Sequence, residues 1–155
     1  MGMKRHGVLQ AALLGAMVAL LLGGCASDTL LARQQEAESS LREAEARYGI
    51  RIEGLQLSAA GAMLDLRYRV VDPVRAAPIL DPKLQPALLD EARGARLGVP
   101  VTPVLGRIRQ TSRNNQIHTD RSYFVLFGNP GKAVQSGDRV SLLLGQVKIT
   151  DLTVR

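Results

Sequence analysis

Short runs of alternating apolar and polar residues, each stopped by Gly or Pro, fill the chain from residue 50 to its end. The clearest run is 63–71, in which the apolar positions are Leu64, Leu66, Tyr68 and Val70. The residues between them, Asp65, Arg67 and Arg69, are charged. A period of two places successive side chains on opposite faces of a strand. The pattern therefore predicts strands with one buried face and one face in water.

Comparable runs predict further strands, and the residues between them predict the turns. The expected strands are 50–57, 63–71, 87–90, 95–99, part of 101–108, 122–127, 140–144 and 147–154. Gly54 indicates a bulge, residues 59–61 and 91–94 indicate two hairpin turns, and Asp72 with Pro73 favours a short helical turn through Ala77. About seven or eight short strands without a long helix among them predict a mainly β fold, a β-sandwich.

One helix is expected before the strands. Residues 27–48 contain no Pro or Gly and are rich in good helix formers. Ser27 or Asp28 could cap its start, and Gly49 stands where a left-handed cap is favoured. The apolar stripe is narrow and consists of Leu30, Ala37, Leu41, Ala44 and Tyr48. Two interpretations remain equal here: a spacer that holds the domain away from a membrane, and a helix that packs on the domain.

The first 24 residues have the order of a secretory signal. Lys4 and Arg5 form a basic start, residues 7–22 are apolar except for Gln10, and small residues precede Cys25. The apolar run is shorter than the roughly 20 residues of a membrane-spanning helix, which makes an uncleaved anchor the weaker interpretation. Leu22-Gly23-Gly24-Cys25 resembles the lipobox of bacterial lipoproteins.

The lipoprotein resemblance implies that the chain is cut before Cys25, acylated on that cysteine and held in the lipid bilayer. Several acyl chains give stable anchoring where one is marginal. Cys25 is also the chain's single cysteine, so an internal disulfide is excluded. Ala26 follows it, where an aspartate would resemble the inner-membrane retention signal. The implied location is the outer membrane, facing the periplasm.

The part of the chain after the helix resembles exported immunoglobulin-like sandwich modules. Tyr68-Arg-Val-Val-Asp-Pro, Arg109-Gln-Thr and Tyr123-Phe-Val-Leu-Phe-Gly-Asn-Pro-Gly resemble segments of uncharacterised bacterial proteins. The resemblance to uncharacterised proteins implies no activity. The chain also lacks the paired cysteines and the core tryptophan of antibody domains, so the resemblance implies only the architecture. The expected organisation is a signal peptide over 1–24, a lipid anchor and helical stalk over 25–49, and an immunoglobulin-like β-sandwich over 50–155.

Basic residues exceed acidic residues, with 20 Lys and Arg against 14 Asp and Glu. Lys4 and Arg5 belong to the signal segment, so the excess persists without it. A mildly basic exported protein favours anionic envelope components, and nucleic acid is not expected in that compartment. The simpler interpretation is that the charge only keeps the protein soluble.

The sequence gives little support to an enzyme. After the signal segment His118 is the only histidine, and no second cysteine or Gly-x-Ser-x-Gly motif accompanies it. A nucleophilic site needs a base and an orienting group beside the nucleophile. Zinc and copper sites need several His or Cys ligands, and the acidic residues do not form a calcium loop. We expect no cofactor and no metal site.

Arginine gathers in one polar stretch, residues 106–121. It contains Arg107, Arg109, Arg113, His118 and Arg121 among Gln, Thr, Ser and Asn residues. The stretch is expected to be a long loop, and long ordered loops in small domains are often functional. Arginine binds phosphate and carboxylate groups in a bidentate manner, so these residues are candidates for binding an anionic partner. The alternative is a mobile surface loop whose arginines are solvated.

The expected function is therefore a non-enzymatic envelope lipoprotein that binds another envelope component, anionic or protein, or takes part in assembly. The partner would dock on the arginine-rich stretch or on an open sheet edge. An envelope hydrolase acting on cell-wall or lipid polymers is the alternative, with Asp65 or Asp120 as its candidate acid. A purely structural subunit is the third interpretation.

Overall fold

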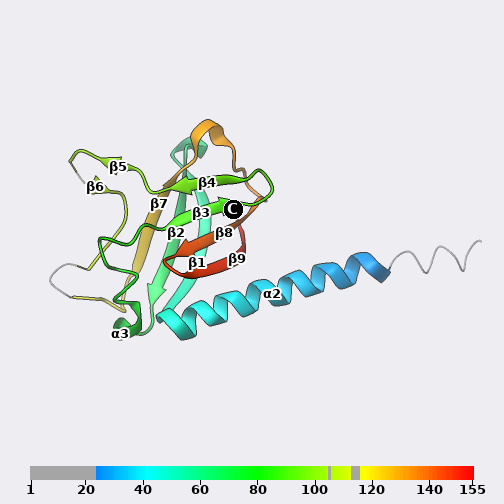
Figure 1. Cartoon of the computed structure of the whole chain (residues 1–155), viewed down its shortest axis with the longest axis horizontal. Helices are drawn as coiled ribbons and strands as arrows, with labels where there is room; N and C mark the ends of the chain where they lie inside the picture. The colour runs from blue at the N-terminus through cyan, green and yellow to red at the C-terminus, as the bar shows by residue number, and fades with distance from the viewer. Residues whose placement is uncertain (1–23, 105, 113–115) are drawn as a thin grey trace, which may run out of the picture. The chain divides into compact units, whose positions relative to one another are not determined.

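The computed structural model describes residues 24–104, 106–112 and 116–155 of the chain. The predicted signal segment, apart from Gly24, lies outside the described residues. The described chain is mainly β, with one long helix preceding the strands (Figure 1). Within the described ranges no helix is long and apolar enough to cross a membrane.

The long helix, α2, runs from Gly24 to Tyr48. It begins before the predicted caps Ser27 and Asp28, so that prediction of its start is wrong. Residues 24–27 include no proline, and nothing in their backbone chemistry ends a helix that is already formed. Two compact units meet within the helix, one ending at Gln35 and one beginning at Glu36.

From Glu36 onward, α2 packs on the β elements. Ala44 is fully buried, and Leu41 and Tyr48 contact the hydrophobic core. The Ser40 hydroxyl lies 3.4 Å from the carbonyl oxygen of Thr150. The expectation of a packed helix is therefore confirmed for this half. A spacer role for the part before Glu36 stays a prediction.

Gly49 joins the helix to the first strand. Its φ of 61° is left-handed, and its N–H donates to the carbonyl of Glu45 at 2.8 Å. Its own carbonyl accepts from the backbone N–H groups of Val71 and Asp72. A Cβ at this position would lie 2.5 Å from the Asp72 carbonyl oxygen, closer than any real contact. Both the backbone angle and the space therefore require glycine here, and the predicted cap is confirmed.

The first sheet contains β1 (Ile50–Ser58), β2 (Met63–Val70) and β7 (Ser122–Gly128) in the order β1-β2-β7. Both pairs are antiparallel, and the 3-10 turn η1 (Ala59–Gly61) connects β1 to β2. The register of β1 shifts between Ile52 and Gly54, which confirms the predicted bulge. The first hairpin is thus confirmed with its turn.

The second sheet has the order β4-β3-β8-β9. Its strands are β3 (Ala87–Asp90), β4 (Ala95–Gly98), β8 (Arg139–Leu144) and β9 (Val147–Thr153). A separate two-stranded hairpin, β5 (Val101–Thr102) with β6 (Gly106–Arg107), occupies the stretch where one short strand was expected. Two short helical elements complete the described chain, α3 (Pro73–Ala76) and η2 (Pro130–Lys132). Asp72 caps α3 by accepting from Val74 and Arg75, as predicted.

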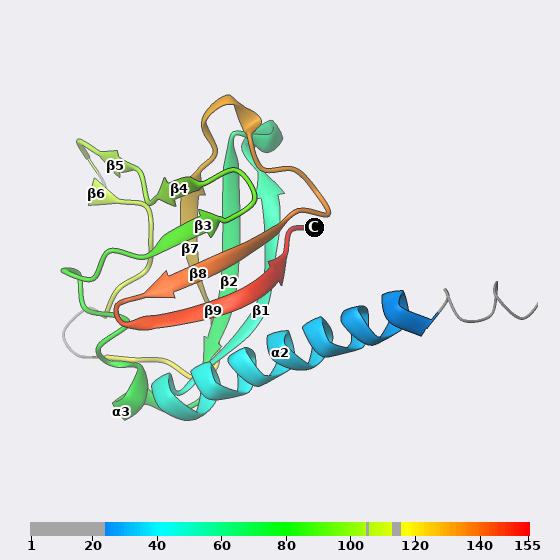
Figure 2. The same ribbon diagram turned by 45° about the vertical axis from the view of Figure 1, so that its right-hand side comes forward.

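Side chains from both sheets form one hydrophobic core. The largest fully buried members include Leu64, Leu66 and Phe127 from the first sheet and Leu88, Leu142 and Ile149 from the second. Figures 1 and 2 both show β8 and β9 crossing over β1 and β2. Alternating residues of each strand therefore meet between the sheets, as their period of two requires.

The end of the chain ties the two sheets together at one side. Leu55 and Val154 form a parallel bridge, beyond the end of β9. The N–H of Leu57 donates to the carbonyl of Arg155 at 3.0 Å, and the N–H of Arg155 donates to the carbonyl of Leu55 at 3.0 Å. These bonds satisfy backbone groups on the outer edge of β1, which otherwise pairs with β2.

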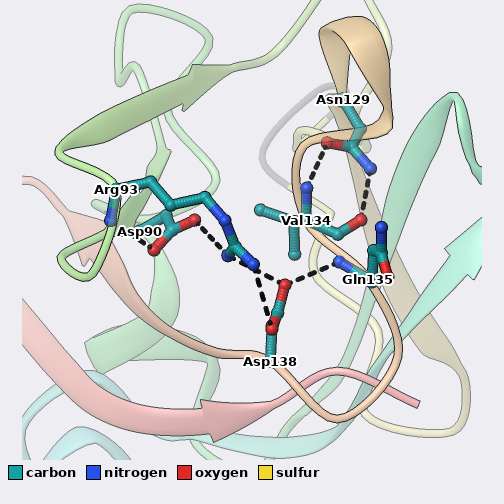
Figure 3. A network of polar contacts seen from close by, with 6 residues as sticks. All are labelled: Asp90, Arg93, Asn129, Val134, Gln135 and Asp138. Carbon is teal, nitrogen blue, oxygen red and sulfur yellow. Dashed lines mark hydrogen bonds and ion pairs between the residues drawn. The ribbon is translucent and has the colours of Figure 1, made fainter.

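A network of polar contacts fixes the turns at one end of the domain (Figure 3). Arg93, in the β3–β4 turn, donates to buried Asp90 at 2.8 Å and to Asp138 at 2.9 Å. Nearby, the Asn129 side chain donates to the carbonyl of Val134 and accepts from its N–H. The two groups connect the β3–β4 turn with the segment that leads into β8.

Candidate functional site

The first part of the arginine-rich stretch is not a free loop. The N–H of Gln110 donates to the carbonyl of Phe124 at 3.1 Å, and the N–H of Leu126 donates to the carbonyl of Ile108 at 3.0 Å. Arg109 pairs with Val125 in an antiparallel bridge. Residues 108–110 therefore lie along the open edge of β7, and the loop prediction is wrong for them. The exposed N–H and C=O groups of β7 supply the reason, since an edge strand favours a pairing partner.

A pocket of about 710 Å³ lies where this segment meets the residues before β7. Four of the five predicted binding residues line it, namely Arg107, Arg109, His118 and Arg121. Its other described lining residues are Pro82, Gln110, Thr111, Gln116 and Tyr123. Arg113, the fifth predicted residue, lies outside the described residues. The volume is that of a small-molecule site.

Arg109 forms a buried part of this pocket and is 9% exposed. Its Nη2 donates to the carbonyls of Ile79 at 2.9 Å and Asp81 at 2.7 Å, and its Nη1 donates to that of Leu84 at 3.3 Å. The guanidinium therefore holds the 79–84 backbone in place. Its Nε is buried and has no hydrogen-bond partner among the described residues. Burial lowers the pKa of Arg109, and the neighbouring charge of Arg107 acts in the same direction.

Arg107 and Arg121 supply the accessible charge. Arg107, at the end of β6, is half-buried and forms no ion pair with any described residue. Arg121 is exposed, and its Nε lies 3.4 Å from the Oδ1 of Asp120. An ion pair this exposed is weak, because water competes for both groups. Both guanidinium groups can therefore exchange their present surroundings for a ligand.

His118 contributes chiefly through its backbone. Its N–H donates to the hydroxyl oxygen of Tyr123 at 2.8 Å, which fixes this segment against β7. Its imidazole is exposed, with Nδ1 lying 3.9 Å from Asp120. Among the described residues no group of three His, Cys, Asp or Glu side chains could hold a metal ion.

Tyr123 is a pocket residue that the sequence analysis missed. It is 5% exposed, lines the pocket from β7, and stacks on Tyr68 with ring centroids 5.6 Å apart. Burial raises the pKa of Tyr68, which therefore stays neutral beneath it. The sequence signal was the apolar strand 122–127, in which the period of two places Tyr123 in line with the core residues Val125 and Phe127. A hydroxyl at such a position needs a polar partner, and that requirement could have indicated the site.

The two acids considered for a hydrolase do not share this pocket. Asp65 was expected on a wet face, but it is 5% exposed, and the guanidinium of Arg67 binds both of its oxygens. Asp120 is exposed beside Arg121. A hydrogen bond from its own backbone N–H, with help from the Arg121 side chain, lowers the pKa of Asp120. A carboxyl group with a lowered pKa is a poor proton donor.

Comparison of the chain with models of protein families, with curated proteins and with solved structures finds no match.

Proposed function

We propose that this chain is a cell-envelope lipoprotein whose β domain is a non-enzymatic binding module for an anionic envelope component. The observation that carries the proposal is the composition of the pocket. Arg107, Arg109 and Arg121 line it, and none of its described lining residues is acidic. Like charges gathered in a concave site raise the local potential and attract an anion.

Binding explains the site better than hydrolysis does. Glycoside hydrolysis requires a pair of carboxyl groups, one of which must be protonated to act as an acid. Asp65 is held in a bidentate ion pair, and the pKa of Asp120 is lowered. A purely structural role does not explain why Arg107 lines the pocket without an ion pair to any described residue. The accessible arginines are therefore the feature that favours a binding module.

Anchoring at the membrane is the second part of the proposal. It rests on the basic start, the apolar segment and the sequence Leu22-Gly23-Gly24-Cys25, and Ala26 favours the outer membrane facing the periplasm. With acyl chains on Cys25 the protein would partner the lipid bilayer directly.

We also propose that the β domain is an immunoglobulin-like sandwich. With residues 108–110 counted beside β7, the strand orders become β1-β2-β7-(108–110) and β4-β3-β8-β9. Apart from the β5–β6 hairpin, these orders follow the Greek-key connections of immunoglobulin-like domains, in which successive pairs of strands alternate between two facing sheets. The parallel bridge between Leu55 and Val154 supports the same assignment.

The anchor is tested by replacing Cys25. The full chain, expressed in a bacterial host, is expected to fractionate with membranes and to carry acyl mass on Cys25. The Cys25→Ala chain is expected to lose that mass and to keep its signal segment. Intact-mass spectrometry of both chains checks this. Cleavage without added lipid in the wild type would contradict the anchor and leave the binding proposal standing.

Anion binding is tested with two polymers, polyglutamate and polyphosphate, and a neutral polymer, dextran. The full chain in a neutral detergent is expected to bind at least one anionic polymer and not dextran, with affinity that falls as salt rises. The Arg107→Gln/Arg121→Gln chain should bind at least about tenfold more weakly, because both accessible charges are lost.

The control for that experiment is Arg33→Gln/Arg42→Gln, which removes the same two positive charges from exposed positions on α2. We expect its affinity to match the wild type within about twofold, because neither residue lines the pocket. Equal weakening by Arg33→Gln/Arg42→Gln would show that net charge, and not the pocket, causes binding. Thermal unfolding of each variant verifies that the fold is retained.

A further inference from the structure

Two neutral polar side chains of the pocket, those of Gln110 and Tyr123, already accept a hydrogen bond from the protein backbone. The Oε1 of Gln110 accepts from the N–H of Phe124 at 3.0 Å, and the hydroxyl oxygen of Tyr123 accepts from the N–H of His118 at 2.8 Å. What these two groups still offer is the amide NH₂ of Gln110 and the hydroxyl hydrogen of Tyr123. Neither has an acceptor among the described residues.

The charged residues of the pocket offer donors as well. Guanidinium groups donate and never accept, and Arg107 and Arg121 are both accessible. Arg109 adds a buried positive charge that carbonyls solvate and that no carboxylate pairs with among the described residues. Residues from β6, from 108–110 and from the start of β7 thus contribute donors to one pocket.

We propose that this pocket binds a phosphate group through Arg107, Arg121, Gln110 and Tyr123. The inference rests on the proposed function and narrows its anionic partner to one chemistry. A ligand here meets donors that come from separate segments of the chain. A planar carboxylate has two oxygens in one plane, whereas a tetrahedral phosphate has oxygens that point in several directions.

Two of the donors are also held in place by the protein, which favours binding. Gln110 and Tyr123 are anchored by backbone N–H groups of β7 and of residue 118, so their free hydrogens are held in place before a ligand arrives. Donors fixed in advance avoid much of the entropy cost of binding. Arg107 and Arg121 have long side chains at accessible positions, so they can adjust around the remaining oxygens.

The experiment titrates the full chain, in neutral detergent, with glycerol 3-phosphate, inorganic phosphate and acetate by calorimetry. We expect both phosphates to bind at least about tenfold more tightly than acetate. The Nε–H signals of Arg107 and Arg121 in the NMR spectrum should shift with the phosphates. Vesicles of phosphatidylcholine with and without phosphatidic acid show whether the bound phosphate belongs to a lipid or to a soluble molecule. Tighter binding to phosphatidic acid vesicles than to free glycerol 3-phosphate would indicate a lipid headgroup.

Three variants locate the binding. Arg107→Gln and Arg121→Gln are each expected to weaken glycerol 3-phosphate binding about tenfold, and Tyr123→Phe, which removes one hydroxyl, should weaken it severalfold. Arg33→Gln should leave it unchanged. Because Arg107 and Arg121 form no buried contacts that the fold needs, loss of binding without a change in thermal unfolding assigns the effect to the site.

Acetate binding as tight as phosphate binding, or unchanged phosphate binding in both arginine variants, would overturn the phosphate proposal. Binding of polyglutamate that depends on Arg107 and Arg121, without phosphate binding, would overturn this inference while the proposed anion-binding function stands. Failure of every anionic probe would overturn both.

Discussion

Replacing Arg93 by Met is expected to destabilise the domain more than the loss of a surface ion pair does, because the buried carboxylate of Asp90 is left without its charged partner. Asp90 is 1% exposed, and its Oδ2 accepts from the Arg93 guanidinium at 2.8 Å. The same guanidinium reaches Asp138 on the segment before β8 (Figure 3). Methionine fills similar space but cannot pair with either acid. Urea unfolding at neutral pH measures the loss.

The matched control is Arg139→Met, which breaks an exposed ion pair of 3.6 Å with Asp151. It should cost less than about 1 kcal/mol, because surface pairs contribute little. Adding Asp90→Asn to Arg93→Met should recover part of the loss, since no buried charge then remains. Equal losses in Arg93→Met and Arg139→Met would contradict the role given to Asp90.

Asp138 supplies a second measurement of the same network. A hydrogen bond from the backbone of Gln135, and then one from Arg93, lower the pKa of Asp138. A lowered pKa in the folded state adds stability above the unfolded pKa, and that stability is lost as the pH falls through the folded value. Arg93→Met should therefore raise the Asp138 pKa in an NMR titration and weaken the dependence of stability on acid.

Asn129→Ala is expected to cost about 3 kcal/mol and to lower the Tm by about 10 °C. The Asn129 side chain, in a residue 2% exposed, donates to the carbonyls of Gly61 and Val134 and accepts from the N–H of Val134. Alanine leaves three backbone groups without these partners. Between the β1–β2 turn and the segment after β7, only the backbone bond from the N–H of residue 129 to the carbonyl of Ala62 then remains among the described residues.

Gln135→Ala is the control, because it shortens an exposed amide side chain in the same segment. The backbone N–H of Gln135 keeps its bond to Asp138, so the variant should be within about 0.5 kcal/mol of the wild type. A Tm for Asn129→Ala within about 2 °C of that for Gln135→Ala would contradict the stabilising role given to the Asn129 side chain. Calorimetry of the three chains decides between the outcomes.

The strands could be predicted closely from the sequence. The runs 63–71, 87–90 and 122–127 match β2, β3 and β7 to within one residue at either end. The reason is physical. The run 63–71 alternates, the other two are dense in apolar residues, and each is bounded on one side by Gly, Pro or a capping Asp, signals that act locally. The pairing of strands in the two sheets could not be predicted, because it depends on contacts between segments that are distant in sequence.

The pocket shows what local patterns miss. Arg109 was grouped with the surface arginines, yet it is buried because residues 79–84 turn their carbonyls toward it. That arrangement depends on segments 25 to 30 positions apart in sequence. Asp65 was misjudged for a similar reason, since Arg67, packed over the Phe124 ring, covers it. Composition identified the basic stretch, and only the tertiary fold separates its structural arginine from its accessible ones.

The bonds that join β1 to Val154 and Arg155 bear on how the domain folds. The outer edge of β1 at Leu55 is paired only when Val154 and Arg155 are present, about 100 positions later in the sequence. Pairing across so much sequence carries a large loop-closure cost and makes folding slow. During synthesis β1 and β2 can form a hairpin early, but the outer edge of β1 is paired only after Val154 and Arg155 have emerged. This late pairing is compatible with the proposed export, in which the chain would cross the membrane before it folds.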